Sequence, residues 1–441
     1  MKLPGFRDFL PEDLALRNHI FDAWRRVSRR YGFVEYDGPP LETLELYRAK
    51  SGDEIVGQLY EFTDKGDRHV ALRPEMTPSL ARIIGGGGRA MAKPIRWFSI
   101  PQLFRYERQQ RGRLREHFQW NVDLVGEGGV EGDAEVLAVA IDGLRELGLD
   151  AAHVCARVSD RVLLSEVLRS VGVQEEQLEA AFRVVDRMEK KPRERVLEWL
   201  QNKDDVGLSK EHAEQVLYVL ERPHIDCIES AFGHVDAVAD RLSDIRQYLT
   251  ILEELGFSEF VEFDLTIVRG LAYYTGIVFE VFDRRGELRA ICGGGRYDHL
   301  LEYVGGDPLP AVGFGMGDVV LGEILRESGK APEYQRQVDY FIVVIGEGQG
   351  GLARRIASAQ RKRGRSVVYS LGSRSVRKQF SSAASVGASL VIVLGPDEVE
   401  RGVAVIRDMA SGGEREIPLE QLMVASELET VAMEIDHKST D

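Results

Sequence analysis

The sequence predicts an α+β domain built on an antiparallel sheet, with a helical insertion inside it and a small α/β domain after it. Three observations carry this prediction. Polar and apolar residues alternate along two expected strands between residues 103 and 124. An almost wholly helical pattern covers residues from about 160 to 250. Beyond residue 338, strands alternate with helices, which is typical of an α/β domain.

The composition is that of an ordinary globular protein with two or three domains. The chain has 441 residues, of which 44% are hydrophobic and 29% are charged. The formal net charge of -15 argues weakly against nucleic acid, although a local basic surface can still bind it. Cys155, Cys227 and Cys292 are far apart and form no CxxC pair, so neither a disulfide framework nor a zinc site is expected. A cytoplasmic location without a membrane partner fits the absence of an apolar signal core or spanning run in the sequence.

The N-terminal region begins with a helix and continues as an extended segment. Apolar residues repeat at helical spacing over residues 12–31, and Gly32 supplies a stop signal. In the following GFVEYDGPPLETLELY, Pro39 and Pro40 exclude a central strand, so the segment is an edge strand or an extended crossing. A subunit interface and a plain loop explain such a segment equally well.

A hairpin and a short helix come next and supply the first candidate ligand contacts. Residues 58–72 form the expected hairpin, which continues into LRPEMTPSLARII. Thr77 before Pro78 is a good helix N-cap, and capping and ligand contact explain Thr77 about equally well. Glu75 shares a face with Thr77 if the strand extends that far. The run Gly85–Gly88 has no preceding strand and no following Lys-Ser/Thr, so we expect a flexible connector rather than a phosphate loop.

The stretch RYERQQRGRLREHFQWNVD, residues 105–123, is the most informative part of the chain. Its second strand has a polar and an apolar face: His117, Gln119, Asn121 and Asp123 against Phe118, Trp120, Val122 and Leu124. A water-facing strand explains the alternation. It does not explain a polar face without Lys or Glu beside a turn that holds four arginines. A cleft for a polar ligand with phosphates explains both features.

The rest of the first domain alternates between helical and strand character. Asp133 is expected to cap a helix. Strands are expected at His153–Val158, Phe263–Val268 and Gly276–Asp283. CGGGRYDHL, at Cys292–Leu300, is expected to form a turn, where three glycines allow a backbone to approach a ligand or simply make a tight loop. AVGFGMGDVVLGEIL then predicts a glycine-rich strand that passes into a helix.

The last part of the chain is a separate domain. Residues 326–337 are polar and contain Pro and Gly, so we expect a linker between a first domain at 1–325 and a second at 338–441. Three strands and two helices predict a mostly parallel sheet there. Its helices carry eight basic residues: Arg354, Arg355, Arg361, Lys362, Arg363, Arg374, Arg377 and Lys378. On charge alone, a solvated helix face explains them slightly better than an RNA surface, although such a concentration in an acidic protein could also be an electrostatic footprint.

Together these motifs resemble those of class II aminoacyl-tRNA synthetases, and specifically histidyl-tRNA synthetases, over nearly the whole chain. GFVEYDGPPLE resembles the first class II motif, which builds the dimer interface in the family. FRYERQQRGRLREHFQWNVD resembles the second motif, and AVGFGMGDVVL lies where the third is expected. VRGLAYYTGIVFE and CGGGRYDHLL resemble the two histidyl-specific motifs. The tail resembles the anticodon-binding domain of the family.

The resemblance implies how ATP is held. Arg105 would bind the α-phosphate, Glu107 would lie near the adenine, and Arg113 would reach the γ-phosphate. Arg269 would be the catalytic arginine of the family, between the histidine carboxylate and the α-phosphate. The third motif normally ends in an arginine that stacks on adenine, but Val320 occupies the matching position here.

The resemblance also implies sites for histidine and tRNA. The histidine-binding residues would be Glu75, Thr77, Gln119, Asp123, Arg269, Tyr273, Tyr274 and Tyr297. Of these, Glu75, Thr77 and Gln119 would hold the α-amino group. Asp123, Tyr274 and Tyr297 would shape the imidazole pocket. The acceptor end of the tRNA would meet the loop residues Arg108, Gln110 and Arg111.

The activity that the resemblance implies is that of a histidine–tRNA ligase. It would use ATP with Mg²⁺ as the substrate complex, without zinc, an organic cofactor or a metal site built from protein side chains. Its partners would be histidine, ATP, tRNA(His) and a second copy of the chain in a homodimer. Besides Val320, Ala272 replaces an aspartate and Gln109 a proline that are common in the family. These departures leave an alternative, a non-catalytic paralogue that acts as a regulatory subunit or as a module that binds tRNA or histidine.

Overall fold

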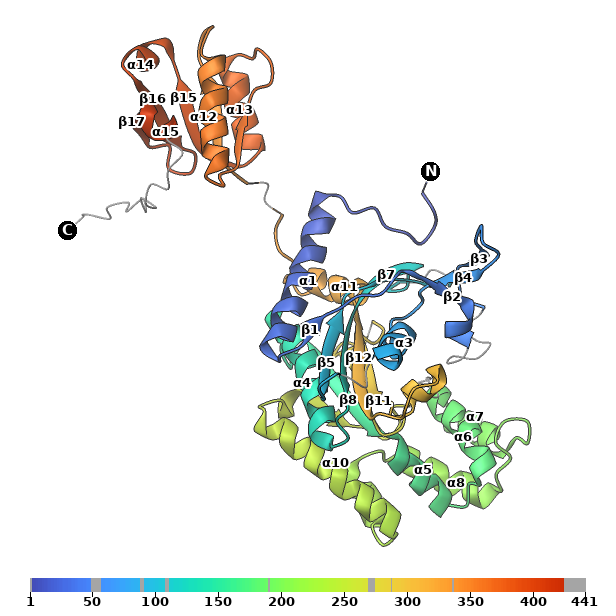
Figure 1. Ribbon diagram of the computed structural model, residues 1–441. Helices are drawn as coiled ribbons and strands as arrows, with labels where there is room; N and C mark the ends of the chain where they lie inside the picture. The colour runs from blue at the N-terminus through green and yellow to red at the C-terminus, as the bar shows by residue number, and fades with distance from the viewer. Residues whose placement is uncertain are drawn as a thin grey trace, which may run out of the picture. The chain divides into compact units, whose positions relative to one another are not determined.

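The chain divides into two compact units, Met1–Pro332 and Glu333–Asp441, which are shown in Figure 1. The structure is a computed structural model, and it describes residues 2–48, 57–87, 91–107, 111–188, 191–268, 274–286, 288–334 and 337–423, without the side chains of 303 and 304. Among these residues, no helix combines the length and the apolar character needed to cross a membrane.

The first unit is built on a nine-stranded sheet. Its main path is β1 (Val34–Glu35), β5 (Ile95–Ser99), β7 (Glu116–Val125), β12 (Ala311–Gly317), β11 (Cys292–Arg296), β10 (Ile277–Asp283), β8 (Val154–Asp160) and β9 (Val261–Phe263), with β6 (Gln102–Phe104) also paired to β7. Neighbours from β5 to β8 are antiparallel, and among the described strands of this sheet only the outer pairs β1–β5 and β8–β9 are parallel. The predicted antiparallel sheet is therefore confirmed.

Helices cover one face of this sheet. They are α1 (Pro11–Arg30), α4 (Val130–Glu146), α10 (Asp236–Glu254) and α11 (Asp318–Glu327). Alternate residues of β7, β12, β10 and β8 join these helices in one large core, with Trp24 stacked on Trp120 at a centroid distance of 5.7 Å. Because side chains alternate along a strand, the other residues of the same strands face away from this core.

A smaller three-stranded sheet precedes the segment with Glu75 and Thr77. It consists of β2 (Leu41–Thr43), β4 (His69–Leu72) and β3 (Glu61–Thr63), and α3 (Thr77–Gly87) follows it. The first helical hydrogen bond of α3 runs from the Leu80 N–H to the Met76 carbonyl at 3.0 Å. Met76 therefore occupies the N-cap position, and the capping interpretation of Thr77 is wrong by one residue.

The helical insertion contains α5 (Arg161–Ser170), α6 (Glu175–Met188), α7 (Arg193–Gln201), α8 (Lys210–Leu220) and α9 (Ile225–Phe232). These helices share a core of their own with the first half of α10 and with Leu265. The predicted insertion is thus confirmed. The short 3-10 helices η2 (Ser258–Phe260) and η3 (Leu300–Val304) complete the unit.

The triple glycine after Cys292 lies in a central strand, so the turn expected there is wrong. β11 pairs with β10 on one side and with β12 on the other. A Cβ atom on Gly295 would lie 2.6 Å from the carbonyl oxygen of Ile277, and one on Gly294 would lie 2.6 Å from the Cβ of Phe314. The glycines are therefore needed because β11 is crowded, and not because the chain turns.

Two further local expectations are corrected. The strand expected at Phe263–Val268 ends at Phe263, because the Asp264 carboxylate accepts hydrogen bonds from the Thr266 N–H at 3.0 Å and hydroxyl at 2.6 Å and so forms a turn. Asp133 does not cap α4, which begins at Val130. It lies inside the first turn, buried against Arg296.

The second unit is a small α/β domain, as predicted. Its sheet has the order β14 (Val367–Tyr369), β13 (Val338–Val344), β15 (Ala388–Leu394), β16 (Val403–Asp408) and β17 (Glu414–Pro418). The helices are α12 (Gly350–Lys362), α13 (Val376–Ser385), α14 (Pro396–Glu400) and α15 (Leu419–Met423). The pairs β14–β13 and β13–β15 are parallel, whereas β15–β16 and β16–β17 are antiparallel, so the sheet is mixed rather than mostly parallel.

Candidate active site

The candidate site lies on the sheet face opposite the helical core. On β7, Trp120, Val122 and Leu124 belong to that core, which leaves the other face to the polar residues, as the alternation predicts. β12 runs antiparallel beside this face, and its three site-facing residues are glycines: Gly313, Gly315 and Gly317 pair with Asp123, Asn121 and Gln119. The polar side chains of β7 therefore have room to lie over β12.

Asp123 and Tyr297 meet directly above Gly313. The Tyr297 hydroxyl donates a hydrogen bond to Oδ1 of Asp123, and both residues are buried. A Cβ atom on Gly313 would lie 2.5 Å from the Tyr297 hydroxyl and 2.6 Å from Asp123 Oδ1. Gly313 is thus required for this hydrogen bond, because any side chain there would displace one partner.

Gln119 lies over Gly315 in the same way. A Cβ atom on Gly315 would lie 2.7 Å from both Cδ and Nε2 of the Gln119 side chain. Gln119 and Asp123 are four residues apart on one strand face, so the two side chains border one continuous polar surface.

Tyr274 and Tyr297 close the end of the site near Asp123. Their ring centroids are 6.5 Å apart, and both rings are buried in a cluster with Leu80, Ala81 and Ile84 of α3. Packing of α3 on the two tyrosines keeps the start of that helix near the same end of the site. The segment contains the buried Glu75 and the half-buried Thr77.

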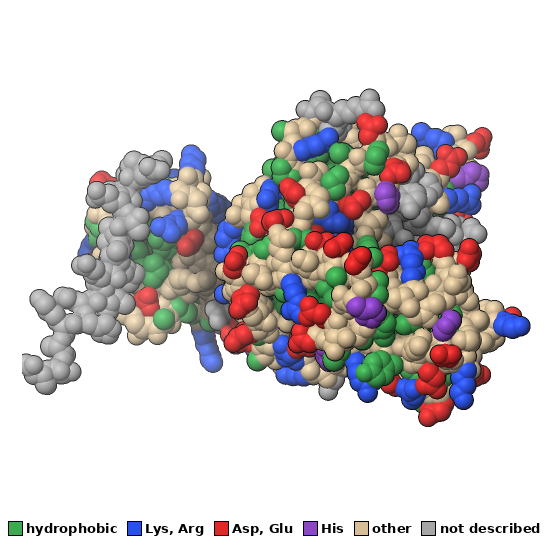
Figure 2. All heavy atoms as spheres, turned by 90° about the horizontal axis from the view of Figure 1, so that it is seen from below, with side chains coloured by type: hydrophobic (Ala, Val, Ile, Leu, Met, Phe, Trp, Pro, Cys, Tyr) green, Lys and Arg blue, Asp and Glu red, His purple; other side chains and the backbone are tan. Residues whose placement is uncertain are grey.

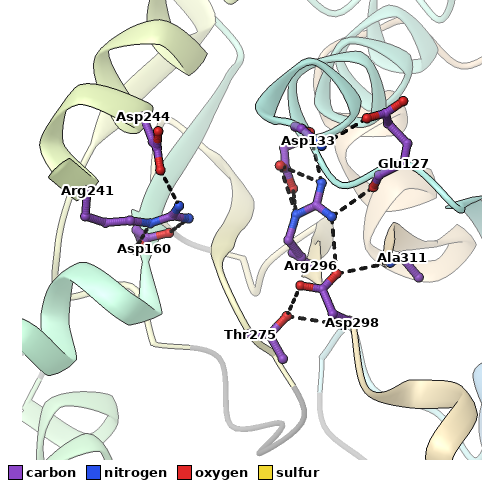
Figure 3. A network of polar contacts seen from close by, with 10 residues as sticks. Glu127, Asp133, Asp160, Arg241, Asp244, Thr275, Arg296, Asp298 and Ala311 are labelled. Carbon is purple, nitrogen blue, oxygen red and sulfur yellow. Dashed lines mark hydrogen bonds and ion pairs between the residues drawn. The ribbon is translucent and has the colours of Figure 1, made fainter. Parts of the chain in front are cut away.

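A polar clamp formed by Thr275, Arg296, Asp298 and Ala311 holds the backbone on either side of the tyrosines (Figure 3). The Thr275 hydroxyl donates to Asp298 Oδ2 at 3.0 Å and accepts from the Asp298 N–H at 3.1 Å. Asp298 Oδ1 accepts from Arg296 and from the Ala311 N–H, each at 3.2 Å. Since Thr275 follows Tyr274 and Asp298 follows Tyr297, the clamp fixes the two rings relative to each other.

Arg296 connects the clamp to α4, as Figure 3 shows. Its guanidinium lies 2.8 Å from Asp133 Oδ2 and donates to the carbonyl oxygens of Glu127 and Gly129 at 3.0 Å. A buried carboxylate is tolerated here because a buried guanidinium pairs with it. Burial nevertheless outweighs Arg296 and raises the pKa of Asp133 to about 6.

The other end of the site is a cavity of about 810 Å³. It is lined by six arginines, Arg105, Arg113, Arg157, Arg284, Arg285 and Arg289, and by four acidic residues, Glu107, Glu262, Glu280 and Asp283. The described lining is therefore cationic, in a chain of net charge -15. On the face drawn in Figure 2, by contrast, acidic and basic side chains are interspersed. An anionic ligand is the natural occupant of such a cavity.

Arg105, Glu107 and Arg113 all line this cavity, although β6 ends at Phe104, so Arg105 and Glu107 do not lie on a strand as expected. Nε of Arg105 donates to the Pro74 carbonyl at 3.0 Å, which orients the guanidinium. Arg113 forms an ion pair with Glu107. Burial and the positive charges of Arg289 and Arg105 lower the pKa of Arg113.

His117 also lines the cavity, whereas the alternation along the strand predicted only that it lies on the polar face of β7. Burial, with the positive charges of Arg105 and Arg7, lowers its pKa to about 3. The imidazole is therefore neutral at physiological pH, and it can stack or form hydrogen bonds without adding a charge. Period-two alternation identified its face, but only the fold shows its charged neighbours.

Val320, near the start of α11, also lines the cavity and is buried. A Cβ atom on Gly112, which has a φ of +72°, would lie 3.2 Å from Cγ2 of Val320, so the loop after β6 packs directly on this valine. Arg111 of the same loop pairs with Glu323 at 3.4 Å and also with Glu327 on α11. Four predicted site residues lie outside the described residues: Arg108, Gln110, Arg269 and Tyr273.

Four arginines that β8 and the β10–β11 turn contribute to the cavity were not among the predicted site residues. Arg157 comes from β8, and Arg284, Arg285 and Arg289 come from the turn between β10 and β11. The basic sequence DRRGELR was visible, but its position beside Arg113 depends on the pairing of β10 with β11 and of β11 with β12.

Comparisons with known proteins show which family the chain resembles. The family profile described as Histidyl-tRNA synthetase matches residues 5–317, and the profile described as Anticodon binding domain matches residues 339–425. A histidine–tRNA ligase from Opitutus terrae is 43% identical over 441 residues, which cover 100% of this chain and 99% of the relative. The chloroplastic/mitochondrial histidine–tRNA ligase of Arabidopsis thaliana is 42% identical over 95% of this chain and 85% of its own.

A solved structure shares the fold. The crystal structure of histidyl-tRNA synthetase from Nostoc sp. PCC 7120 superimposes with a TM-score of 0.78 at 23% identity, over 96% of this chain and 98% of its own. At that identity the structural match supports the fold alone. The sequence matches, which cover 95% or more of the chain at more than 40% identity, establish kinship. The chain belongs to the histidyl-tRNA synthetase family.

Proposed function

We propose that this chain is a histidine–tRNA ligase. It joins histidine to ATP to give histidyl-adenylate and pyrophosphate, and then transfers histidine to the 3' end of tRNA(His). The observation that carries the proposal is the buried Asp123–Tyr297 pair at one end of a face whose other end is a cationic cavity. The relatives named above are ligases, which favours the enzyme over a non-catalytic paralogue.

Histidine is selected at the Asp123 end of the site. The Tyr297 hydroxyl donates to one oxygen of Asp123, which holds the carboxylate in a fixed orientation. A fixed carboxylate then accepts a hydrogen bond from an imidazole N–H, which amino acids of similar size with apolar side chains lack. Tyr274 and Tyr297 exclude water from this end because both rings are buried.

Activation joins two anionic groups, the histidine carboxylate and the α-phosphate. The substrate carboxylate is already ionised, so the reaction requires no general base from the protein. Guanidinium groups, which keep their charge, offset the repulsion and stabilise the charge that builds up in the transition state. Arg105 supplies one such group at the cavity, and the family resemblance assigns the second to Arg269, which lies outside the described residues.

ATP enters with Mg²⁺ as the substrate complex. The metal is bound mostly by phosphate and water oxygens, which is the usual preference of Mg²⁺ with nucleotides. The cationic lining of the cavity suits the triphosphate, and its volume of about 810 Å³ is ample for a nucleotide.

Contacts with tRNA and with a second subunit complete the proposal. The acceptor end meets the loop of Arg108, Gln110 and Arg111, and the second unit binds the anticodon. The chain functions as a cytoplasmic homodimer. Exposed apolar residues in and near the first-motif region support the dimer, because Val34 and Leu41 are 62% and 37% exposed and Phe62, in the same small sheet as Leu41, is 51% exposed.

Histidine-dependent exchange of pyrophosphate into ATP tests this function directly. We expect exchange by the purified chain, because it reports adenylate formation without tRNA. Arg269→Ala should lower the rate roughly 100-fold or more, the usual effect of removing a donor that acts on transition-state charge. Histidine should still bind to this variant in calorimetry. A folded wild-type chain without exchange would refute the proposal, and unchanged turnover in Arg269→Ala would refute the role of that residue.

A further inference from the structure

The wall of the cavity formed by the start of α11 supplies no positive charge. Val319 and Val320 line it there, and the Gly112 backbone packs on Val320. An arginine at position 320 would bring a cation to the nucleotide from this side. Any cation that joins Arg113 at the terminal phosphates must therefore come from an element other than α11.

Most arginines of the cavity already have an acidic partner. Arg113 pairs with Glu107, Arg284 with Glu262 at 2.8 Å, Arg285 with Glu327 at 3.9 Å and Arg157 with Asp264 at 4.0 Å. Within the described residues, no carboxylate lies within ion-pair distance of Arg105 or Arg289. No described carboxylate therefore neutralises the charge of either guanidinium.

Arg289 approaches the predicted ATP residues from across the sheet. It lies on the turn between β10 and β11, three residues before Cys292, which pairs with Met316 near the end of β12. Its positive charge acts on Arg113 strongly enough to lower the pKa of that residue, as does the charge of Arg105. Arg105, Arg113 and Arg289 thus come from three separate segments and line the same cavity. Their positive charges repel one another until a polyanion binds.

We propose that Arg289 binds the β- and γ-phosphates of ATP, and so supplies from the β10–β11 turn the cation that Val320 lacks. This inference rests on the proposed function and deepens it. Arg289 is better suited to the terminal phosphates than to the adenine. A neutral base would not offset the repulsion between Arg289 and Arg113, whereas a polyanion can bind both guanidiniums. A planar guanidinium can contact two phosphate oxygens at once. Pyrophosphate, the leaving group, then departs from Arg113 and Arg289 while the adenylate stays on Arg105.

The test compares three variants with the wild-type chain in pyrophosphate exchange. Arg289→Ala should raise KM for ATP and for pyrophosphate roughly tenfold, the effect of losing one charge-assisted hydrogen bond. Arg289→Lys should recover part of the loss, because it keeps the charge but not the two-pronged geometry. Arg246→Ala is the control: it removes an arginine of α10 that pairs with Asp226 and Glu229 and does not line the cavity. We expect it to change both constants much less.

A second measurement distinguishes a contact of Arg289 with the terminal phosphates from a contact with the adenine. Calorimetric affinity for a sulfamoyl analogue of histidyl-adenylate, which lacks pyrophosphate, should be unchanged in Arg289→Ala. Parallel weakening of this analogue, unchanged KM values, or an equal effect of Arg246→Ala would each overturn the inference. If the wild-type chain gave no exchange, the proposed function would fail and the inference with it. Exchange with unaltered constants in Arg289→Ala would overturn the inference alone.

Discussion

At the scale of single residues, Gly313 is the position where the histidine pocket depends most on the absence of a side chain. We expect Gly313→Ala to raise KM for histidine by an order of magnitude or more, because the new methyl group would separate Asp123 from Tyr297 and remove the hydrogen bond between these two buried side chains. KM for ATP should change little. Steady-state pyrophosphate exchange at varied histidine gives both values.

The matched control for this substitution is Gly317→Ala on the same strand face. A Cβ atom there would meet no other atom within 4 Å. The same change of residue type should therefore leave KM for histidine as in the wild-type chain. Equal loss in both variants would show that any added methyl group disturbs β12, and that the Asp123–Tyr297 hydrogen bond is not the cause.

His117 should make the fold sensitive to acid. Its pKa falls from 6.5 to about 3 on folding, so between these values the unfolded chain binds more protons than the folded one. Stability is then lost as the pH falls below about 6.5, with a slope of at most about 1.4 kcal/mol per pH unit from this group. His117→Gln should flatten the dependence of the free energy of unfolding on pH between 6 and 4, measured by denaturant titration. Identical slopes in the two proteins would contradict the assignment.

Sequence pattern predicted the faces of single residues but not their partners. The alternation along β7 correctly placed Gln119 and Asp123 opposite Trp120. It could not show that Asp123 meets Tyr297 across Gly313, because Asp123 and Gly313 lie on different strands and Tyr297 follows a third, β11. Arg289 was missed for the same reason, since its neighbour Arg113 is far away in the chain.

At the scale of structural elements, the clamp between the ends of β10 and β11 positions the two tyrosines. We expect Thr275→Val to raise KM for histidine about five- to tenfold, since the variant keeps the shape but removes the two hydrogen bonds between the Thr275 hydroxyl and Asp298. The ATP cavity lies at the other end of these strands, so KM for ATP should be nearly constant. Exchange kinetics with each substrate varied in turn measure both effects.

Thr266→Val serves as the control for the clamp. Thr266 also donates its hydroxyl to an aspartate, Asp264 at 2.6 Å, but in a local turn after β9. Its loss should have little effect on histidine binding. If Thr266→Val raised KM for histidine as much as Thr275→Val did, the clamp would have no special part in holding the tyrosines.

Elements with local signals were predicted well, and those defined by distant pairing were not. The helices of the insertion follow from apolar spacing and are confirmed. The glycines of β11 signal a turn by their local preference, but pairing with β10 and β12 on both sides makes them a strand. In the second unit, β16 and β17 make the sheet mixed, which the alternation of strands and helices up to Leu394 did not indicate.

At the scale of the whole molecule, the fold separates two kinds of chemistry on one sheet face. One end is buried, aromatic and built around Asp123, and the other is open and cationic. The net charge of -15 gave no sign of the cationic cavity, because the total does not show how charges are distributed. The class of both units was predictable from sequence, whereas the composition of the cavity required the strand order.

Pyrophosphate exchange measured side by side with each of the standard amino acids tests the central claim most directly. Asp123, Tyr274 and Tyr297 are proposed to admit an imidazole, and the cationic cavity to hold ATP for attack by its carboxylate. The account predicts exchange that depends on histidine and that no other amino acid supports at a comparable rate. Exchange that proceeds equally well with another amino acid, or its absence with histidine in a folded chain, would contradict it.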